Sequence, residues 1–340
     1  MKKESQKTGK NLFRWIPGII VSLLIVYILL RFINPEELKK ALFSFKPETI
    51  FLILLLVILS MAARSMAWRV MIGGKTRFQD SFFAVSVGYM LNNIIPRSGE
   101  VGKAILMGSS SGRGTLFILS TVVVERALDL AIAAGMFLTT LPLALQMESL
   151  KPIAIAMLAI VLVALLLLVI MANNKKKVHQ YISRVGSKYS LIQKYLLPGL
   201  DSLLDGFSIL TKPGKFLLSV FWILVCWVLW ALLYQVAIMT FSPSAPFWWA
   251  IFAQAVLAMG IALPSAPAGL GVFEGALVAA LAVLDKNTNQ SAYLGMALVL
   301  HAIQILTTFV LGGYGLLRQG WSLQKLIDQI KIRRNDKEEA

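Results

Sequence analysis

The sequence is poor in the residues that build metal sites and disulfide frameworks. Its 340 residues include one cysteine, Cys226, and two histidines, His179 and His301. A single cysteine excludes an internal disulfide and a cysteine-ligated zinc site. Two histidines far apart in the sequence argue against a histidine metal cluster. We therefore expect no metal and no other cofactor.

Catalytic signatures are also missing. The sequence has no HExxH, no GxSxG and no phosphate-binding loop with Gly-Lys-Ser. No loop is long enough to fold an extracytoplasmic catalytic domain. Glu36 and Glu37 are compatible with the acid of a membrane glycosyltransferase. The same Asn-Pro-Glu-Glu-Leu run is, however, typical of a proline-started, acid-rich helix N-terminus. We therefore expect that the protein is not an enzyme.

Acidic residues are outnumbered by basic ones. The chain has 33 Lys and Arg against 17 Asp and Glu, which gives a formal net charge of +16. The cations stand at the ends of apolar segments, where anionic lipid headgroups attract them. We therefore expect membrane lipids with an anionic or zwitterionic headgroup as partners, and no nucleic acid. The sequence leaves oligomerisation open.

Apolar residues dominate what is present. They make up 57% of the chain, against about 45–50% in soluble domains, and the mean hydropathy is +0.74. Several apolar segments are long enough to cross a bilayer alone. These are 12–33, 49–72, 115–142, 152–172, 216–241 and 291–318. The first has no small-residue cleavage site after it, so we expect a retained helix. The fold class predicted is an all-α polytopic membrane protein with six full spans.

The other apolar segments form two pairs, each joined at a cluster of proline and glycine. The pairs are 78–95 with 98–112, around Pro96 and Gly99, and 246–263 with 265–284, around Pro264, Gly269 and Gly271. Proline removes a donor and clashes with the preceding turn, so these clusters should end a helix. The limb 98–112 would be only about 21 Å long, which is short of a bilayer core of about 30 Å. We predict two re-entrant helical hairpins, with two full spans per pair as the alternative.

Positive charge sets the orientation. Lys and Arg gather in the N-terminal arm, after the span 49–72, in the loop 173–215 and in the tail 319–340. All of these segments fall on one side of the membrane, whether each pair is a re-entrant hairpin or two full spans. Both termini are therefore predicted to be cytoplasmic, in the cell membrane. Loop 34–47, with three lysines, is the exception.

The loop 173–215 and the tail differ from the spans in mixing apolar and basic residues. We predict that the loop forms amphipathic helices on the inner surface, with a solvated connector as the alternative. The tail is predicted to be a short amphipathic helix that fades into disorder.

The order of the elements repeats in opposite directions within this single membrane domain. The half 12–142 contains two spans, a hairpin from the inside and a span, and the half 152–318 has the same order with its hairpin from outside. Broken segments at matching places of inverted halves indicate a transporter's midplane site. The alternative is that Pro and Gly are simply more frequent in membrane helices.

Polar residues inside apolar segments are the candidate substrate-binding site, because such groups are costly in a membrane unless they are paired. The candidates are Asn92, Asn93, Arg97, Ser98, Gly99, Glu100, Lys103, Glu125, Arg126, Asp129, Pro264, Gly269, Gly271, Glu274 and His301. Five tryptophans at helix ends or on helix faces are assigned no site, since interfacial belts account for most of them. These are Trp222, Trp227, Trp230, Trp248 and Trp249.

The residues at the first break suit an anion. Arg97 offers a guanidinium fork for phosphate oxygens. Ser98 or Gly99 would cap the second limb and leave free N–H groups. Pairing of Arg97 with Glu100 is the structural alternative. The two asparagines before the break would bind a headgroup or satisfy carbonyls freed by the proline.

The charged residues of the span 115–142 suit cations or packing. Glu125 and Asp129 share a helix face, and Arg126 is within reach of Asp129. This arrangement fits a proton- or cation-coupled carboxylate or a partner for Arg97. It fits equally a structural ion pair that fixes helix packing.

The second break offers a carboxylate and a histidine. Glu274 would exchange a proton as a lone carboxylate, or be satisfied by backbone N–H groups; by its place in the repeat it matches Glu100. His301 would relay protons or make an interhelical hydrogen bond.

Three motifs in order resemble the lysylphosphatidylglycerol synthase transmembrane-region family, also called flippase-like. The motifs are Gly88–Ala104, Val124–Asp129 and Leu263–Glu274. Arg64 with Trp68 also fits the family pattern, and the resemblance covers about 12–318. The family includes the membrane half of the multiple peptide resistance factor, which moves aminoacylated phosphatidylglycerol from the inner to the outer leaflet.

The resemblance implies a lipid flippase. Its substrate would be a phospholipid, with aminoacylated phosphatidylglycerol as one example, or a polyprenyl-phosphate lipid. No soluble aminoacyl-transferase domain follows the membrane segments in this sequence, so we do not expect synthase activity. A secondary transporter of a small solute or ion, and a membrane enzyme acting on lipid-linked sugar, are the alternatives.

Overall fold

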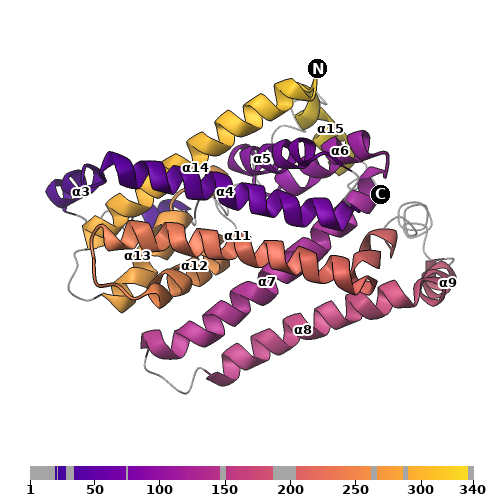
Figure 1. The fold of residues 1–340 in the computed structure, drawn as a ribbon, viewed down its shortest axis with the longest axis horizontal. Helices are drawn as coiled ribbons and strands as arrows, with labels where there is room; N and C mark the ends of the chain where they lie inside the picture. Colours follow the sequence, from indigo (N-terminus) through magenta and orange to yellow (C-terminus); the bar gives the residue numbers. More distant parts are fainter. Residues whose placement is uncertain are drawn as a thin grey trace.

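The computed structural model describes residues 20, 22–27, 34–73, 76–145, 151–186, 204–261, 266–285 and 290–335. These residues are helical and contain no strand (Figure 1). Five segments are long and apolar enough to cross a membrane. They are α4 (Pro47–Ile72), α7 (Thr115–Leu145), α11 (Pro213–Met239), Pro267–Leu284 and α14 (Gln290–Arg318). The predicted all-α polytopic membrane protein is confirmed at this level.

Four of the six predicted spans coincide with four of these helices, and a fifth is present as the helix α8 (Lys151–Asn173). The predicted span 12–33 lies largely outside the described residues. Proline at N1 starts α4 and α11, as expected where a backbone N–H would be unpaired anyway. Gly73 ends α4 in a left-handed conformation with φ 107°.

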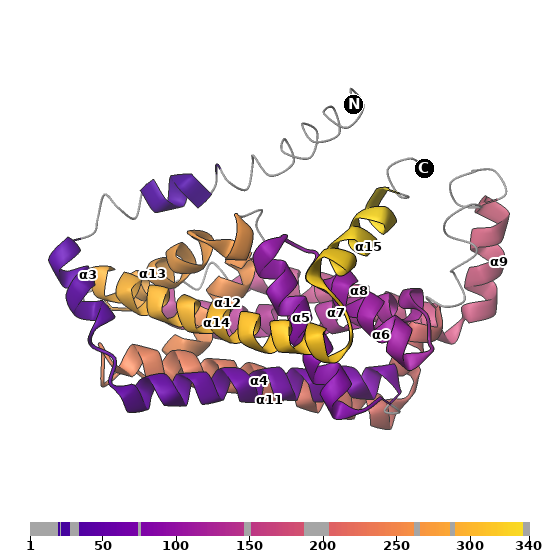
Figure 2. The same ribbon diagram turned by 90° about the horizontal axis from the view of Figure 1, so that it is seen from above.

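The long helices run in one general direction, and α4 lies against α11 along much of its length (Figures 1 and 2). Two clusters of buried side chains hold the bundle together. One contains Trp68 and Leu106 near the end of α4, and the other contains Ile53 and Leu300 near its start. Both halves of the chain contribute side chains to each of the two clusters.

The two predicted hairpins are present as helix pairs. The first is α5 (Phe78–Ile94) with α6 (Gly99–Ser111). The second is α12 (Phe247–Ile261) with α13 (Val272–Leu284), preceded by the short helix η4 (Pro267–Gly269). In Figure 1 the first pair lies in the half of the molecule near α15, and the second lies in the half near α3.

Each hairpin packs against the last helix of the opposite half. The helix α5 contacts α14, α12 contacts α7, and η4 contacts α5. Two inverted halves would pack in this way. Re-entry of the hairpins into the bilayer and the inverted repeat itself stay predictions.

Short helices cover the ends of the bundle. Asn34 caps α3 (Pro35–Leu42) by accepting a hydrogen bond from Glu36 N at 3.0 Å, so the acidic run is a helix N-terminus. The helix α9 (Lys175–Gly186) lies in the predicted amphipathic loop, of which 187–203 fall outside the described residues. Its placement on the membrane surface stays a prediction.

The helix predicted for the tail is present, and the disorder predicted after it falls on residues outside the described ranges. Residues Leu323–Asn335 form the helix α15, and Leu326 and Ile330 are buried. The tail helix contacts α6, and its apolar side is buried at these two residues. Residues 336–340 lie outside the described residues.

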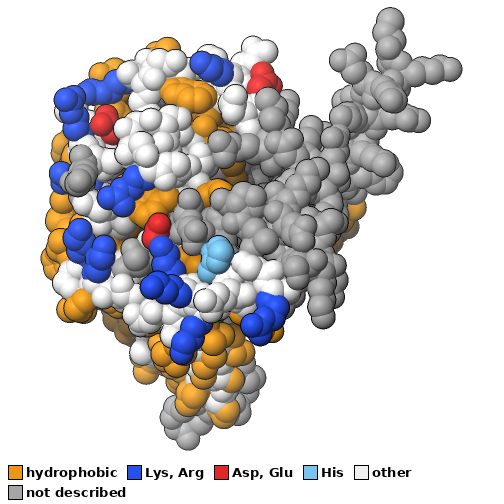
Figure 3. All heavy atoms as spheres, turned by 90° about the vertical axis from the view of Figure 1, so that its right-hand side faces the viewer, with side chains coloured by type: hydrophobic (Ala, Val, Ile, Leu, Met, Phe, Trp, Pro, Cys, Tyr) orange, Lys and Arg blue, Asp and Glu red, His pale blue; other side chains and the backbone are white. Residues whose placement is uncertain are grey.

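Basic side chains gather on one end of the bundle, which faces the viewer in Figure 3. At this end α4, α8 and α14 finish and α11 begins (Figure 1). Its exposed cations include Arg113, Lys176, Lys177, Lys212, Lys215, Arg318 and Lys325. We name this end the basic face; its location in the cytoplasm stays a prediction.

Candidate functional site

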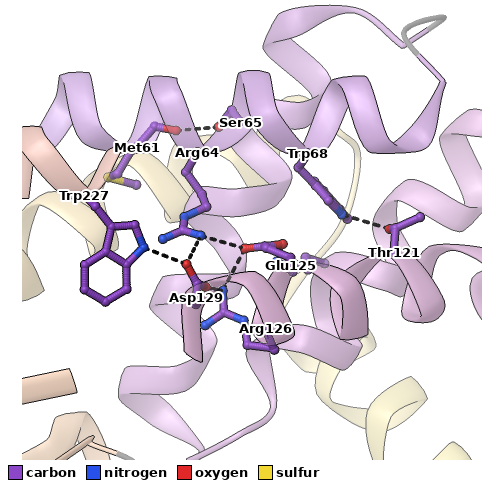
Figure 4. A network of polar contacts seen from close by, with 10 residues as sticks. Met61, Arg64, Ser65, Trp68, Thr121, Glu125, Arg126, Asp129 and Trp227 are labelled. Atoms are coloured by element: carbon purple, nitrogen blue, oxygen red, sulfur yellow. Dashed lines mark hydrogen bonds and ion pairs between the residues drawn. The ribbon is translucent and has the colours of Figure 1, made fainter. Parts of the chain in front are cut away.

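Five charged side chains from three helices meet inside the bundle. Figure 4 labels Arg64, Glu125, Arg126 and Asp129 of this group. Arg64 comes from α4, Lys103 from α6, and Glu125, Arg126 and Asp129 from α7. Four of these side chains are 1–12% exposed, whereas Arg126 is 44% exposed. We call this set the ion network. It carries three positive and two negative side chains.

Glu125 lies at the centre of the ion network. Its Oε2 is 2.7 Å from Lys103 Nζ, and its Oε1 is 2.7 Å from Arg126 NH2 and 3.5 Å from Arg64 NH1. The side chain is 1% exposed, so these cations replace water as its partners. Three cations around one buried carboxylate offset its loss of hydration in the apolar bundle.

Asp129 lies one turn further along α7. Its Oδ1 accepts hydrogen bonds from Arg64 NH1 at 2.7 Å and from the indole of Trp227 at 2.9 Å. Trp227, to which the sequence analysis assigned no site, therefore contacts the ion network. No local sequence pattern predicts this contact, because 98 residues separate the two side chains.

Two further side chains orient the ion network. Lys103 Nζ lies 4.8 Å from the ring centroid of Trp68, a cation–π contact. The indole of Trp68 donates to the hydroxyl of Thr121 at 3.2 Å. Arg64 and Trp68 are one turn apart on α4, so a single helix face supplies both. Of the residues in this paragraph, the candidate list contained Lys103 alone.

The ion network has unused capacity for a ligand. Arg64 Nε and Asp129 Oδ2 are buried and make no hydrogen bond within the described part of the chain, although Arg126 NH2 lies 3.2 Å from that carboxylate oxygen. The exposed guanidinium of Arg126 and the excess positive charge suit an anion.

The first break is capped by a different residue from the one predicted. Ser98 stands at the N-cap of α6 in a helical conformation without a side-chain cap, and its hydroxyl donates to carbonyls at the end of α5. Asn92 takes its place, since its Oδ1 accepts from Gly99 N at 2.7 Å. The predicted serine cap is therefore wrong. The N–H group of Gly99, which was expected to be free at this helix start, therefore donates to the side chain of Asn92.

The remaining candidate residues of the first break lie in different surroundings. Asn93 donates to Thr308 of α14 at 2.8 Å. Lys103 joins the ion network, and Glu100 lies half-buried in the first turn of α6. Arg97 is exposed at the tip, in a left-handed conformation with φ 61°. Glu125 and Asp129 pair with the cations of the ion network.

The second break contains a hydrogen-bonded pair. His301 Nδ1 lies 2.6 Å from Glu274 Oε1, and Glu274 Oε2 accepts from Gly271 N at 2.8 Å. Glu274 is therefore not a lone carboxylate. The interhelical hydrogen bond predicted for His301 is confirmed, because Glu274 lies on α13. Pro264 lies outside the described residues, and Gly269 and Gly271 have φ of 74° and 82°.

His301 makes a second polar contact, since its Nε2 lies 2.9 Å from the carbonyl oxygen of Ala268. The ring therefore joins α14 both to Glu274 of α13 and to the backbone of η4.

Comparison with known proteins places the chain among membrane proteins. A family described as the lysylphosphatidylglycerol synthase TM region matches residues 15–312. A UPF0104 membrane protein of Methanocaldococcus jannaschii is 32% identical over 120 residues, which is 34% of this chain and 36% of that relative. The match thus spans about a third of the relative's length. No solved structure matches the chain.

Proposed function

This chain belongs to the lysylphosphatidylglycerol synthase TM region family, and from that premise we propose that it moves a lipid with a phosphate-bearing headgroup between the leaflets of the cell membrane. The observation that carries the proposal is the ion network. The substrate class is a phospholipid, which includes aminoacylated phosphatidylglycerol, or a polyprenyl-phosphate lipid.

The depth of the ion network supports a headgroup path. Arg64 lies eight residues before Ile72, the end of α4, or about 12 Å along the helix axis. Glu125 lies ten residues after the start of α7, or about 15 Å. Charges this far inside apolar helices are costly, and helix packing alone does not require an excess cation. A phosphate arriving from the basic face would meet Arg126 and balance that excess charge.

The hairpin tips supply the second part of the proposal. Arg97 occupies a left-handed conformation that residues with a side chain rarely adopt, and such strain is concentrated at functional positions. The contact of η4 with α5 brings the second break next to the first hairpin. In this proposal the headgroup passes the tips while its acyl chains stay in lipid. Glu125, Asp129 and Glu274 would hold amines or offset the arginines.

A fluorescent-lipid translocation assay in proteoliposomes tests the proposal. The protein should accelerate the loss of labelled phosphatidylglycerol from the inner leaflet, where the label is protected from an impermeant reagent, above the rate in protein-free vesicles. Arg97→Gly should lower the rate at least about tenfold, which corresponds to one charged hydrogen bond. The same change relieves the left-handed strain, so thermal stability should not fall. Lys176→Gln, an exposed basic residue on α9, is the matched control and should leave the rate unchanged.

Two outcomes would contradict the proposal. An unchanged rate for Arg97→Gly removes that residue from the headgroup path. No acceleration for any phosphate-bearing lipid removes the flippase itself. Solute-dependent thermal stabilisation without lipid preference would then favour a small-solute transporter. New products in mass spectra after incubation with labelled lipid-linked sugars would favour an enzyme.

A further inference from the structure

A small cavity of about 50 Å³ opens at the basic face. Its apolar floor is formed by Met71 at the end of α4, Phe117 at the start of α7 and Ile209 in the short helix η3 (Ser208–Thr211). Its rim carries three cations, Arg113, Lys212 and Lys215. None of these residues belongs to the ion network, so the cavity is a separate feature of the molecule.

The three cations line one cavity without a compensating acid. No lining residue is acidic, and no carboxylate in the described ranges pairs with Arg113, Lys212 or Lys215. Asp205, an acid close to η3 in the sequence, forms an ion pair with Lys175. Bringing three like charges to one cavity is unfavourable unless an anion joins them.

The protein holds one of these cations in a fixed place. The guanidinium of Arg113 lies 5.0 Å from the ring centroid of Phe117. It also packs against Gly73, where an added Cβ would lie 3.1 Å from Arg113 NH2. Arg113 is thus held between an aromatic ring and a glycine that leaves room for it, at the rim of the cavity.

The start of α11 adds backbone donors. Lys212 is the N-cap and makes no side-chain cap, and Pro213 occupies N1. The N–H groups of Gly214 and Lys215 therefore have no intrahelical partner. They stand at the positive end of the helix dipole, beside the lysine rim. The cavity, its three cations and the start of α11 all suit an anionic ligand.

We propose that this cavity binds the phosphate group of an anionic membrane lipid of the inner leaflet. Basic pockets between membrane helices at the cytoplasmic side suit such headgroups. The apolar surface for the acyl chains starts beside the rim, because Leu217, Leu218 and Phe221 of α11 are 65%, 46% and 55% exposed. This proposal does not depend on the proposed translocation, since it requires only that the lipid binds at the cavity. Free phosphate shares this chemistry and is the alternative source.

The test is lipid binding to the full chain in neutral detergent, followed by native mass spectrometry. The probes are phosphatidylglycerol, phosphatidylcholine and inorganic phosphate. The cavity variant is Arg113→Gln, Lys212→Gln, Lys215→Gln. The matched control is Lys176→Gln, Lys177→Gln, Lys325→Gln, which removes the same charge from exposed positions on the same face. The single variant Lys215→Gln serves if the triple variant unfolds.

The expected result is a preference for phosphatidylglycerol over phosphatidylcholine, weakened at least about tenfold in the cavity variant and unchanged in the control. Selective loss of inorganic phosphate binding in the cavity variant also supports a phosphate site and assigns it to a soluble ligand. Equal weakening in both triple variants, or no weakening in the cavity variant, overturns the proposal. Translocation rates are measured separately, so a failed flippase assay leaves this result standing.

Discussion

Glu125 is the residue on which most of the ion network depends, because it contacts three cations. Glu125→Gln would leave three cations facing one carboxylate, whereas Lys103→Gln would leave two of each sign. We expect Glu125→Gln to destabilise the protein by about 3–5 kcal/mol, the usual cost of breaking a buried ion pair. Lys103→Gln should cost clearly less. Thermal unfolding in detergent, followed by tryptophan fluorescence, measures both.

A double-mutant cycle provides the control for this comparison. Lys103 Nζ and Glu125 Oε2 are 2.7 Å apart, so the double variant Lys103→Gln, Glu125→Gln should be more stable than the sum of the single losses predicts. The expected coupling is about 1–3 kcal/mol. Additive losses, or a larger loss for Lys103→Gln than for Glu125→Gln, would show that charge balance does not hold the ion network together.

Glu274 permits a comparison between losing a charge and losing a partner. An amide at this position still accepts from Gly271 N and donates to a neutral imidazole, so Glu274→Gln should keep the helix junction. Glu274→Ala leaves both Gly271 N–H and His301 Nδ1 buried without a partner, at about 1–3 kcal/mol each. Thermal unfolding should therefore rank wild type and Glu274→Gln close together, with Glu274→Ala well below them. Similar losses in both variants would mean that the charge, rather than the hydrogen bonds, holds this junction.

At the scale of elements, the first hairpin depends on a close approach of two glycines. A Cβ at Gly99 would lie 2.0 Å from the carbonyl oxygen of Gly88 and 2.8 Å from Asn92 Cγ, and backbone atoms cannot move aside cheaply. Gly99→Ala should therefore separate α5 from α6 and weaken the asparagine cap. The expected loss is several kcal/mol, with reduced yield of folded protein.

Gly135→Ala in α7 is the matched control for that change. An added Cβ there meets nothing within 4 Å, and Ala is favoured over Gly inside a helix by up to about 1 kcal/mol. Thermal unfolding should thus move in opposite directions for the two variants. A loss for Gly135→Ala as large as that for Gly99→Ala would assign the effect to general intolerance of substitution.

Helices were predictable from the sequence because length and apolar content are local properties. The bounds of α4, α11 and α14 follow from apolar runs, and α4 and α11 also begin at a proline. The contacts between helices were not predictable in this way, since Arg64 and Asp129 are 65 residues apart. Arg64 was nevertheless visible as an arginine inside an apolar run. The acids of α7 could be named, but their partners could not.

The structure also shows matching polar contacts in the two halves. Lys103 on the second limb of the first hairpin pairs with Glu125 of the following helix α7. Glu274 on the second limb of the second hairpin pairs with His301 of the following helix α14. Glu274 thus makes in its half the contact that Lys103 makes in the other half, while its match with Glu100 by place in the repeat stays a prediction. A polar tie between limb and next helix recurs in both halves, and this supports the inverted repeat that we predict.

At the scale of the whole molecule, the basic face predicts the orientation in the membrane. Lys176 of α9 lies at this face, and Lys39 of α3 lies at the opposite end of the bundle (Figure 1). Loop 34–47 breaks the charge rule, so Lys39 is the more demanding position to test. Because short basic loops stay in the cytoplasm, Lys39 should be accessible from outside the cell and Lys176 from inside.

Cysteine labelling with a membrane-impermeant maleimide measures this directly. The natural Cys226 is fully buried, so the unsubstituted protein should give no background and serves as the control. Lys39→Cys should be labelled in intact cells, and Lys176→Cys only after permeabilisation. The reverse pattern would place the basic face outside and remove the inner-leaflet source of the phosphate proposed for the cavity. Labelling of both in intact cells would instead indicate two orientations, in which case the positive charge of this chain does not fix its direction.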